Sequence, residues 1–133
     1  MESTGREQGR QLLETLLQEV VSTGTVPIDR CFAPGYEQWM DGTLFDYDAF
    51  VHHAQQLREG RLGYAFNGYT IHETVTEGNK FVVRYSLTGN YADGRPFNTM
   101  VLTLFELQHG RFIHSWEFNH VEEGKTAEES TER

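Results

Sequence analysis

Apolar and polar residues alternate with the two-residue period of β-strands through the second half of the chain, from Tyr64 to Val121. Short turns that contain Gly divide this half into four predicted strands, at about residues 62–76, 80–91, 96–108 and 111–121. The turns themselves are Gly78-Asn79, Asp93-Gly94 and His109-Gly110. The pattern therefore predicts an antiparallel meander whose strands are joined by tight hairpins.

The lengths of these turns fix which side chains share a face of the predicted sheet. Two-residue loops at all three turns would pair Val83 with Thr74 and Leu104, and Leu104 with Ser115. The core face is then Phe81, Val83, Tyr85, Leu87, Met100, Leu102, Leu104 and Ile113. The same register sets Glu73 across from Arg84 on the other, more polar face, which is a favourable pair. Three-residue or bulged turns, especially at Gly78, stay open as alternatives, and a slip of one residue would exchange the faces.

The first half of the chain has helical spacing. Apolar residues follow a three-to-four spacing that predicts a helix from about residue 3 to Thr23, ended by Gly24: Leu12, Leu13, Leu16, Leu17, Val20 and Val21. A short second helix is expected at residues 28–32, followed by an extended segment at 36–40. Asp46 is the expected N-cap of a third helix that runs to about Arg58. One stripe of that helix carries Phe50, His53, Ala54 and Leu57.

Helices followed by a meander predict an α+β architecture, with the N-terminal helices packed on the concave face of a curved antiparallel sheet. A chain of 133 residues is expected to form one domain. The final charged stretch, residues 122–133, is nearly free of apolar side chains, so we expect a disordered tail after a domain at residues 1–121. The outer face of the sheet also carries large apolar residues. We therefore expect a homodimer through the outer-face positions Val101, Phe105, Trp116 and Phe118.

Composition narrows the classes of partner. The net charge of −9 and the absence of a basic patch argue against nucleic acid. No apolar run approaches the roughly 20 residues that a membrane span needs, and we recognise no signal peptide, so a cytoplasmic protein without membrane contact is expected. The single cysteine, Cys31, lies in an apolar neighbourhood and is interpreted as a buried small hydrophobe.

Metal and cofactor chemistry has little support in the sequence. His52 and His53 are adjacent on a helix and point about 100° apart, so they do not chelate one ion together. His114 and His120 lie about 20 Å apart along a strand. No glycine-rich phosphate loop precedes a helix. We expect no protein-built metal site and no cofactor.

Several motifs, in their order and spacing, resemble the nuclear transport factor 2-like superfamily, and most of all its SnoaL-like polyketide cyclase and ketosteroid isomerase-like branch. These are Glu77-Gly78-Asn79-Lys80 before Phe81-Val82-Val83-Arg84-Tyr85, Gly89 with Asp93-Gly94, and His109-Gly110 with Trp116-Glu117. The similarity covers about residues 8–121. It implies a cone-shaped, cystatin-like α+β barrel, usually dimeric, with a pocket between the helices and the concave sheet. It implies no single activity, because such folds carry isomerases, epoxide hydrolases, dehydratases, cyclases and non-catalytic domains.

The resemblance also implies roles for particular residues. In cyclase-like members a carboxylate on the last strand, in a Trp-Asp type pair, serves as the acid/base. Trp116-Glu117 stands at that motif, with a side chain longer by one methylene. The segment that often ends in His in such proteins ends here in Trp39, which cannot transfer a proton.

The predicted register places His72, Tyr85, Leu102 and Glu117 in one row across the sheet. Apolar neighbours should raise the pKa of Glu117, which suits a general acid/base, whereas the alternative is a satisfied structural carboxylate. Tyr85 could donate to a developing oxyanion, as phenols do in isomerase-like members, or serve only as a core aromatic. His72 is the second candidate base, unless it faces solvent at the rim.

The expected ligand is a small apolar molecule, and a set of mostly apolar side chains is expected to surround it: Tyr36, Trp39, Met40, Phe45, Tyr64, Met100, Leu102 and Asn119. Ordinary packing of these residues is the alternative. Two functions stay open: a cofactor-independent proton-transfer enzyme, and a non-catalytic binding or dimerisation module. An open pocket that reaches Glu117 would favour the enzyme, and a closed core the module.

Overall fold

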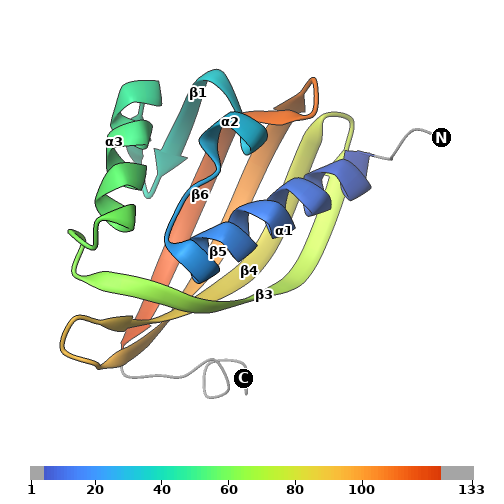
Figure 1. The fold of residues 1–133 in the computed structure, drawn as a ribbon. Helices are drawn as coiled ribbons and strands as arrows, with labels where there is room; N and C mark the ends of the chain where they lie inside the picture. The colour runs from blue at the N-terminus through green and yellow to red at the C-terminus, as the bar shows by residue number, and fades with distance from the viewer. Residues whose placement is uncertain (1–4, 124–133) are drawn as a thin grey trace.

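The structure is a computed structural model that describes residues 5–123. The helices of this part are α1 (Gly5–Thr23), α2 (Ile28–Cys31) and α3 (Tyr47–Arg58). The strands are β1 (Phe32–Met40), β2 (Thr43–Phe45), β3 (Tyr64–Glu77), β4 (Lys80–Tyr91), β5 (Pro96–Gln108) and β6 (Arg111–Glu123) (Figure 1). The predicted helices and long strands are confirmed with small shifts at their ends, whereas the short strand β2 was not foreseen.

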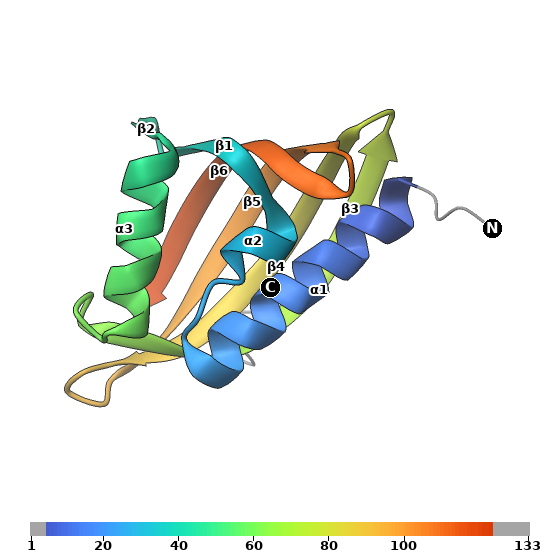
Figure 2. The same cartoon turned by 45° about the horizontal axis from the view of Figure 1, so that its top comes forward.

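The strands form one curved, open sheet in the order β2-β1-β6-β5-β4-β3. Every neighbouring pair is antiparallel except β1 and β6, which are parallel. All three helices lie over the same face of this sheet, with α1 across β3 and β4 and α3 beside β1 (Figure 2). The predicted α+β architecture is confirmed, and the concave face of the sheet is the one that the helices cover.

Local signals explain where the helices begin and end. The Asp46 side chain accepts a hydrogen bond from the backbone N–H of Ala49 at 2.8 Å, so the predicted N-cap of α3 is confirmed. Helix α1 ends at Thr23, and Gly24 directly after it has a φ of 73°, the left-handed conformation that glycine adopts most easily.

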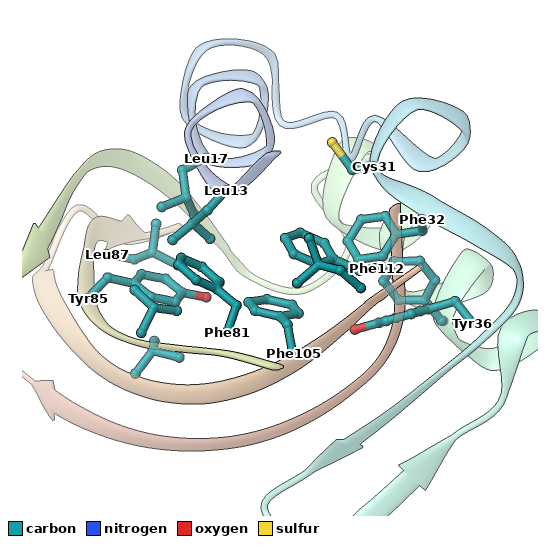
Figure 3. Packing of buried hydrophobic residues seen from close by; sticks show 14 residues of the cluster. Leu13, Leu17, Cys31, Phe32, Tyr36, Phe81, Tyr85, Leu87, Phe105 and Phe112 are labelled. Atoms are coloured by element: carbon teal, nitrogen blue, oxygen red, sulfur yellow. The ribbon is translucent and has the colours of Figure 1, made fainter. Parts of the chain in front are cut away.

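The core lies between α1 and the concave face of the sheet. Leu13 and Leu17 of α1 point toward Phe81 and Leu87 of β4 (Figure 3). Helix α1 approaches closely because residue 9 is glycine: a Cβ added there would lie 2.6 Å from Cγ of Phe81. A methyl group at this position would therefore push the helix away from the sheet.

A second part of the core is aromatic and joins β1 to β6 and β5. The rings of Phe105 and Phe112 stack with centroids 4.0 Å apart, and Phe32 and Tyr36 pack beside them (Figure 3). Such ring pairs stabilise a core beyond the area that they bury. Cys31 is buried and free next to this group, in agreement with the expectation from sequence.

The hairpin between β4 and β5 differs from the prediction by one residue. The N–H of Tyr91 donates to the carbonyl of Arg95 at 2.9 Å, which closes a three-residue loop in place of the expected two-residue loop. Val83 therefore pairs with Thr103, so Val101 and Phe105 face the core and are 2% and 3% exposed. Met100, Leu102 and Leu104 were predicted on the core face; this was wrong, because one extra loop residue exchanges the two faces of β5.

A bulge at Ile113 corrects the face of the last strand. The two-residue turn between Gln108 and Arg111 is as predicted, and Leu107 pairs with Phe112. The next pairs are Glu106 with His114 and Thr103 with Glu117, so Ile113 is an extra residue in β6. Glu117 therefore lies on the concave face, as predicted, because the longer loop and the bulge cancel each other.

A further bulge moves His72 out of the predicted row. The pairs of Glu73 with Arg84 and Thr74 with Val83 are as predicted, but Tyr85 pairs with Ile71. His72 is the extra residue between them, and its Nε2 lies 2.9 Å from Oγ of Ser86 on the outer face. The predicted row of His72, Tyr85, Leu102 and Glu117 is therefore wrong: Tyr85 pairs with Val101 and Glu117 with Thr103, so these two share the concave face but lie in different rows.

The outer face of the sheet exposes several large apolar side chains. Phe118 is 64% exposed and Leu102 50%, and Trp116 lies beside Trp39 of β1. Of the four residues expected at a dimer interface, Trp116 and Phe118 lie on this face, whereas Val101 and Phe105 are in the core. The homodimer itself stays a prediction.

The end of the domain lies slightly beyond the predicted boundary. Strand β6 runs to Glu123, and Glu122 is buried, so the last strand continues past residue 121. The remainder of the predicted tail, residues 124–133, lies outside the described residues. Within residues 5–123, no helix is both long enough and apolar enough to cross a membrane.

Candidate functional site

A cavity of about 360 Å³ lies between the helices and the concave face of the sheet. Its walls are mostly apolar and come from α1, α3 and five of the strands. Polar side chains reach it at only a few positions, which include Gln38, Asp41, His53, Thr99, Glu117 and Asn119. An apolar cavity with a few convergent polar groups is the usual form of a small-molecule site.

Glu117 is the carboxylate at the sheet side of this cavity. Its Oε1 accepts a hydrogen bond from Oγ1 of Thr103 at 3.4 Å, and its Oε2 accepts one from Nδ2 of Asn119 at 3.1 Å. Burial raises the pKa of Glu117, and the nearby charge of Asp41 adds to this, whereas the two hydrogen bonds lower it; the net direction is upward. The side chain therefore holds its proton more firmly than an exposed glutamate does.

Asp41 forms a second carboxylate at the rim of the cavity. It lies in the turn between β1 and β2 with a φ of 50°, and its backbone N–H donates to the carbonyl of Glu117 at 2.9 Å. Its carboxylate accepts from the backbone N–H of Asn119 at 2.9 Å and from Nδ2 of Asn119 at 3.2 Å. The amide of Asn119 thus bridges two carboxylates, which orients both of them.

Tyr85 is connected to Glu117 by hydrogen bonds through Thr103. Burial raises the pKa of Tyr85 well above its usual value, and the charges of Glu117 and Tyr36 add to this, whereas a hydrogen bond with Thr103 lowers it. Thr103 donates in turn to Glu117. The three side chains form a hydrogen-bonded chain, Tyr85–Thr103–Glu117, that ends at the carboxylate.

Tyr36 and Tyr64 are two further phenols near the carboxylate of Glu117. The hydroxyl of Tyr36 donates to Oε1 of Gln38 at 2.9 Å and lies 2.6 Å from Oγ of Ser115. Burial raises the pKa of Tyr36, and burial likewise raises the pKa of Tyr64; the charge of Glu117 raises both further. Their protons therefore stay in place across the physiological range, and neither phenol serves as a base.

His53 of α3 is the histidine that lines the cavity. Burial lowers the pKa of His53, and the neighbouring His52 lowers it further, so the imidazole is biased toward its neutral form. Its ring contacts the ring of Phe45 with centroids 5.6 Å apart. Within residues 5–123, no group of three or more His, Cys, Asp or Glu side chains is arranged to hold a metal ion.

Comparison with solved structures identifies the fold. An M. tuberculosis LEH-like epoxide hydrolase matches with a TM-score of 0.70 at 14% identity, over 88% of this chain and 86% of that one. A Mesorhizobium loti protein named for a likeness to SnoaL-type polyketide cyclases matches with a TM-score of 0.64 at 12% identity, over 86% and 98%. An NTF2-like protein of unknown function from Cytophaga hutchinsonii matches with a TM-score of 0.60 at 11% identity, over 83% and 97%.

The chain has the nuclear transport factor 2-like fold. No protein family model matches the sequence, and no curated protein matches it either. At these identities the likeness establishes the fold alone, which is the fold that the resemblance in sequence implied.

Within this nuclear transport factor 2-like fold, six of the predicted site residues line the cavity: Tyr36, Met40, Tyr64, Tyr85, Glu117 and Asn119. The others do not. Met100, Leu102 and Trp39 lie on the outer face because of the register of their strands, and Phe45 packs behind His53. His72 was a candidate base, but it contacts Ser86 on the outer face, so the sheet separates it from Glu117.

Sequence reasoning missed Asp41, Thr103 and His53 as site residues. Asp41 directly follows the extended segment predicted at residues 36–40, and nothing in its local sequence indicates that this part of the chain meets β6. Thr103 was assigned to the outer face by the register error in β5. His53 had a usable signal, because it shares the inward stripe of α3 with Phe50 and Leu57, which also line the cavity.

Proposed function

We propose that this protein is a cofactor-independent enzyme that catalyses proton transfer on a small, largely apolar molecule, with Glu117 as the general acid/base. The observation that carries the proposal is the open cavity of about 360 Å³ that reaches Glu117. A core closed by Leu and Met side chains would have favoured a module without chemistry. The cavity instead gives a ligand direct access to a carboxylate whose pKa is raised.

The chemistry of the cavity supports this class of reaction. A carboxylate whose pKa is raised toward neutrality exchanges protons with carbon or oxygen acids more readily than an exposed one. Asn119 and Thr103 hold its two oxygens in place, so Glu117 is oriented before a ligand enters. The charge of Glu117 raises the pKa of the Tyr64 hydroxyl. We propose this hydroxyl as the hydrogen-bond donor to negative charge that develops on the substrate.

Isomerisation, cyclisation, dehydration and hydrolytic opening all need such a proton transfer. The similar structures include one named as an epoxide hydrolase and one named for a likeness to polyketide cyclases, which agrees with this set of reactions. Tyr85 has a revised role in the proposal. Because its hydroxyl is engaged with Thr103, it acts on Glu117 through Thr103 and is a positioning residue.

One observation favours the second function, a non-catalytic binding module. Both carboxylate oxygens of Glu117 already accept hydrogen bonds from the protein, as expected for a structural carboxylate. In that case the cavity binds its ligand without changing it.

The experiment compares hydrogen–deuterium exchange by the wild type and by Glu117→Gln. Small apolar ketones and epoxides are incubated with protein in D₂O, and NMR follows deuterium incorporation into the ketones and opening of the epoxides. We expect wild-type protein to catalyse one of these changes and Glu117→Gln to lose it. Glu14→Gln, a partly exposed carboxylate of α1 in a surface ion pair with Arg10, is the matched control and should keep full activity. Ligands that bind in the cavity but react at the same rate with both proteins would support the binding module instead.

A further inference from the structure

The cavity has an unbalanced set of charges. It contains the carboxylates of Asp41 and Glu117, and no Lys or Arg is among the described residues that line it. The basic side chain at its wall is His53, whose pKa burial lowers. The whole chain carries a net charge of −9, so the surroundings offer no excess of positive charge. A negatively charged ligand would enter against this field, and a positively charged one would enter with it.

The hydrogen-bonding groups around Glu117 are unbalanced in the same direction. The amide of Asn119 donates to both carboxylates, Thr103 donates to Glu117, and Tyr36 donates to Gln38. The donors of this network are thus engaged within the protein, and the carboxylates keep further lone pairs, since each oxygen can accept more than one hydrogen bond. A ligand group that contacts these two carboxylates must therefore donate hydrogen bonds. An ammonium offers three N–H donors, an alcohol one, and a carboxylate none.

The walls of the cavity suit the remainder of such a ligand. Nine Phe and Tyr residues line it within the described part of the chain, among them Tyr36, Tyr64 and Tyr91. Their rings bury an apolar skeleton, and their faces attract a cation within about 6 Å. A partly buried carboxylate among aromatic rings, without a cation from the protein, is an arrangement suited to binding an amine.

We propose that the ligand of this cavity is an apolar molecule that ends in one protonated amine, with the ammonium group placed between Glu117 and Asp41 and the skeleton against the aromatic walls. The proposal narrows the proposed function to a class of substrate, and it rests on that function only for the location of the site. An ammonium ion at this position favours ionised Glu117, which is the form that acts as a base. Carboxylates and phosphates of the same size should be rejected.

The test uses three ligands that share a naphthalene ring and differ in charge: naphthalen-2-ylmethylamine, naphthalen-2-ylmethanol and naphthalene-2-carboxylate. Their dissociation constants are measured at pH 7 by calorimetry with the full chain. We expect the amine to bind about tenfold or more tightly than the alcohol, because a hydrogen bond between an ammonium and a carboxylate is stronger than one from a neutral hydroxyl. The carboxylate should bind weakest of the three.

Two variants show whether the carboxylates cause the preference. Glu117→Gln and Asp41→Asn should each reduce the ratio of amine to alcohol affinity, while Glu14→Gln should leave the ratio unchanged. Circular dichroism checks that each variant is folded, and Asp41→Asn at the rim serves if Glu117→Gln is not. An unchanged ratio in both folded variants would overturn the proposal.

The outcomes also separate this proposal from the proposed function. Equal affinity for the three ligands, or tightest binding of the carboxylate or the alcohol, overturns the amine class. This result does not bear on catalysis, which the exchange assay with Glu117→Gln tests separately. If the amine binds but the protein catalyses neither deuterium exchange into the ketones nor opening of the epoxides, the amine class of ligand is kept and the proposed enzymatic function is overturned. Failure of all three ligands to bind at millimolar concentration overturns the amine proposal and the assignment of the cavity as a ligand site.

Discussion

The two faces of β5 and β6 are built from alternating residues of the same strands, and they differ sharply in burial. On the concave face Val101, Phe105 and Glu117 lie under the helices, and even the carboxylate is held by hydrogen bonds from the protein. On the outer face Leu102 and Phe118 are half or more exposed. Because neighbouring residues on a strand share local sequence and backbone, the difference shows that the cover provided by α1 and α3 creates the site, and that the strand alone does not.

The sharpest way to break this comparison is to shorten one residue on each face. Phe105→Ala should lower the free energy of unfolding by about 3–5 kcal/mol, because it leaves a cavity in a packed aromatic group. Leu102→Ala on the same strand should lower it by less than about 1 kcal/mol, since the side chain is half exposed. Urea unfolding of both variants measures the difference. Similar losses for the two would contradict a register of β5 that buries Phe105 and exposes Leu102.

The register of β5 is also the feature of the fold that could not be predicted from the sequence. The order of the elements, the three helices, the N-cap at Asp46 and the face of β4 could all be predicted, because each depends on residues close together in the chain. The length of the loop at Asp93-Gly94 could not. An Asp-Gly pair suits a two-residue turn as well as a three-residue one, and the choice exchanges the faces of a whole strand.

Only part of the candidate site could be predicted from the sequence, because its residues depend on the same details of strand register. Glu117 was placed correctly only because the bulge at Ile113 reversed the error from the preceding loop. His72 was misplaced because the bulge at that residue has no signal in the local sequence. Asp41 was missed because it reaches Glu117 through the parallel pairing of β1 with β6, which joins parts of the chain far apart in sequence.

The next largest effect concerns what covers the outer face. We propose a homodimer through the apolar patch formed by Trp39, Leu102, Trp116 and Phe118, because so much exposed aromatic surface favours a partner. Trp116→Glu should weaken this dimer by about 2 kcal/mol or more, as expected for an aromatic residue at the centre of an interface. Analytical ultracentrifugation at tens of micromolar should show a wild-type dimer and a variant that is monomeric or aggregated. A monomeric wild type would rule the dimer out.

A smaller effect should follow from the proton of Glu117. Its folded pKa is raised, so the stabilisation that it contributes is fully present below the unfolded pKa of about 4.3 and is lost as pH rises through the folded pKa. Glu117→Gln cannot ionise. Its melting temperature relative to wild type should therefore increase as pH rises through this window and then level off. Thermal melts from pH 4 to pH 8 test the sign; a relative melting temperature that falls with rising pH would mean that Glu117 is stabilised as an anion.

The smallest expected effect belongs to the ion pair of the outer face, Glu73 with Arg84. Nη2 of Arg84 lies 2.6 Å from Oε1 of Glu73, and both side chains are well exposed in the single chain. A double-mutant cycle with Glu73→Gln and Arg84→Gln should give a coupling of about 0.2–1 kcal/mol, because solvent and salt screen such pairs. Its salt dependence also sharpens the comparison of the two faces. A coupling well above 1 kcal/mol that resists added salt would mean that a partner covers this part of the outer face and removes water from the pair. A weak, salt-sensitive coupling in a protein that is dimeric would confine the interface to the side of the sheet near Trp116 and Phe118.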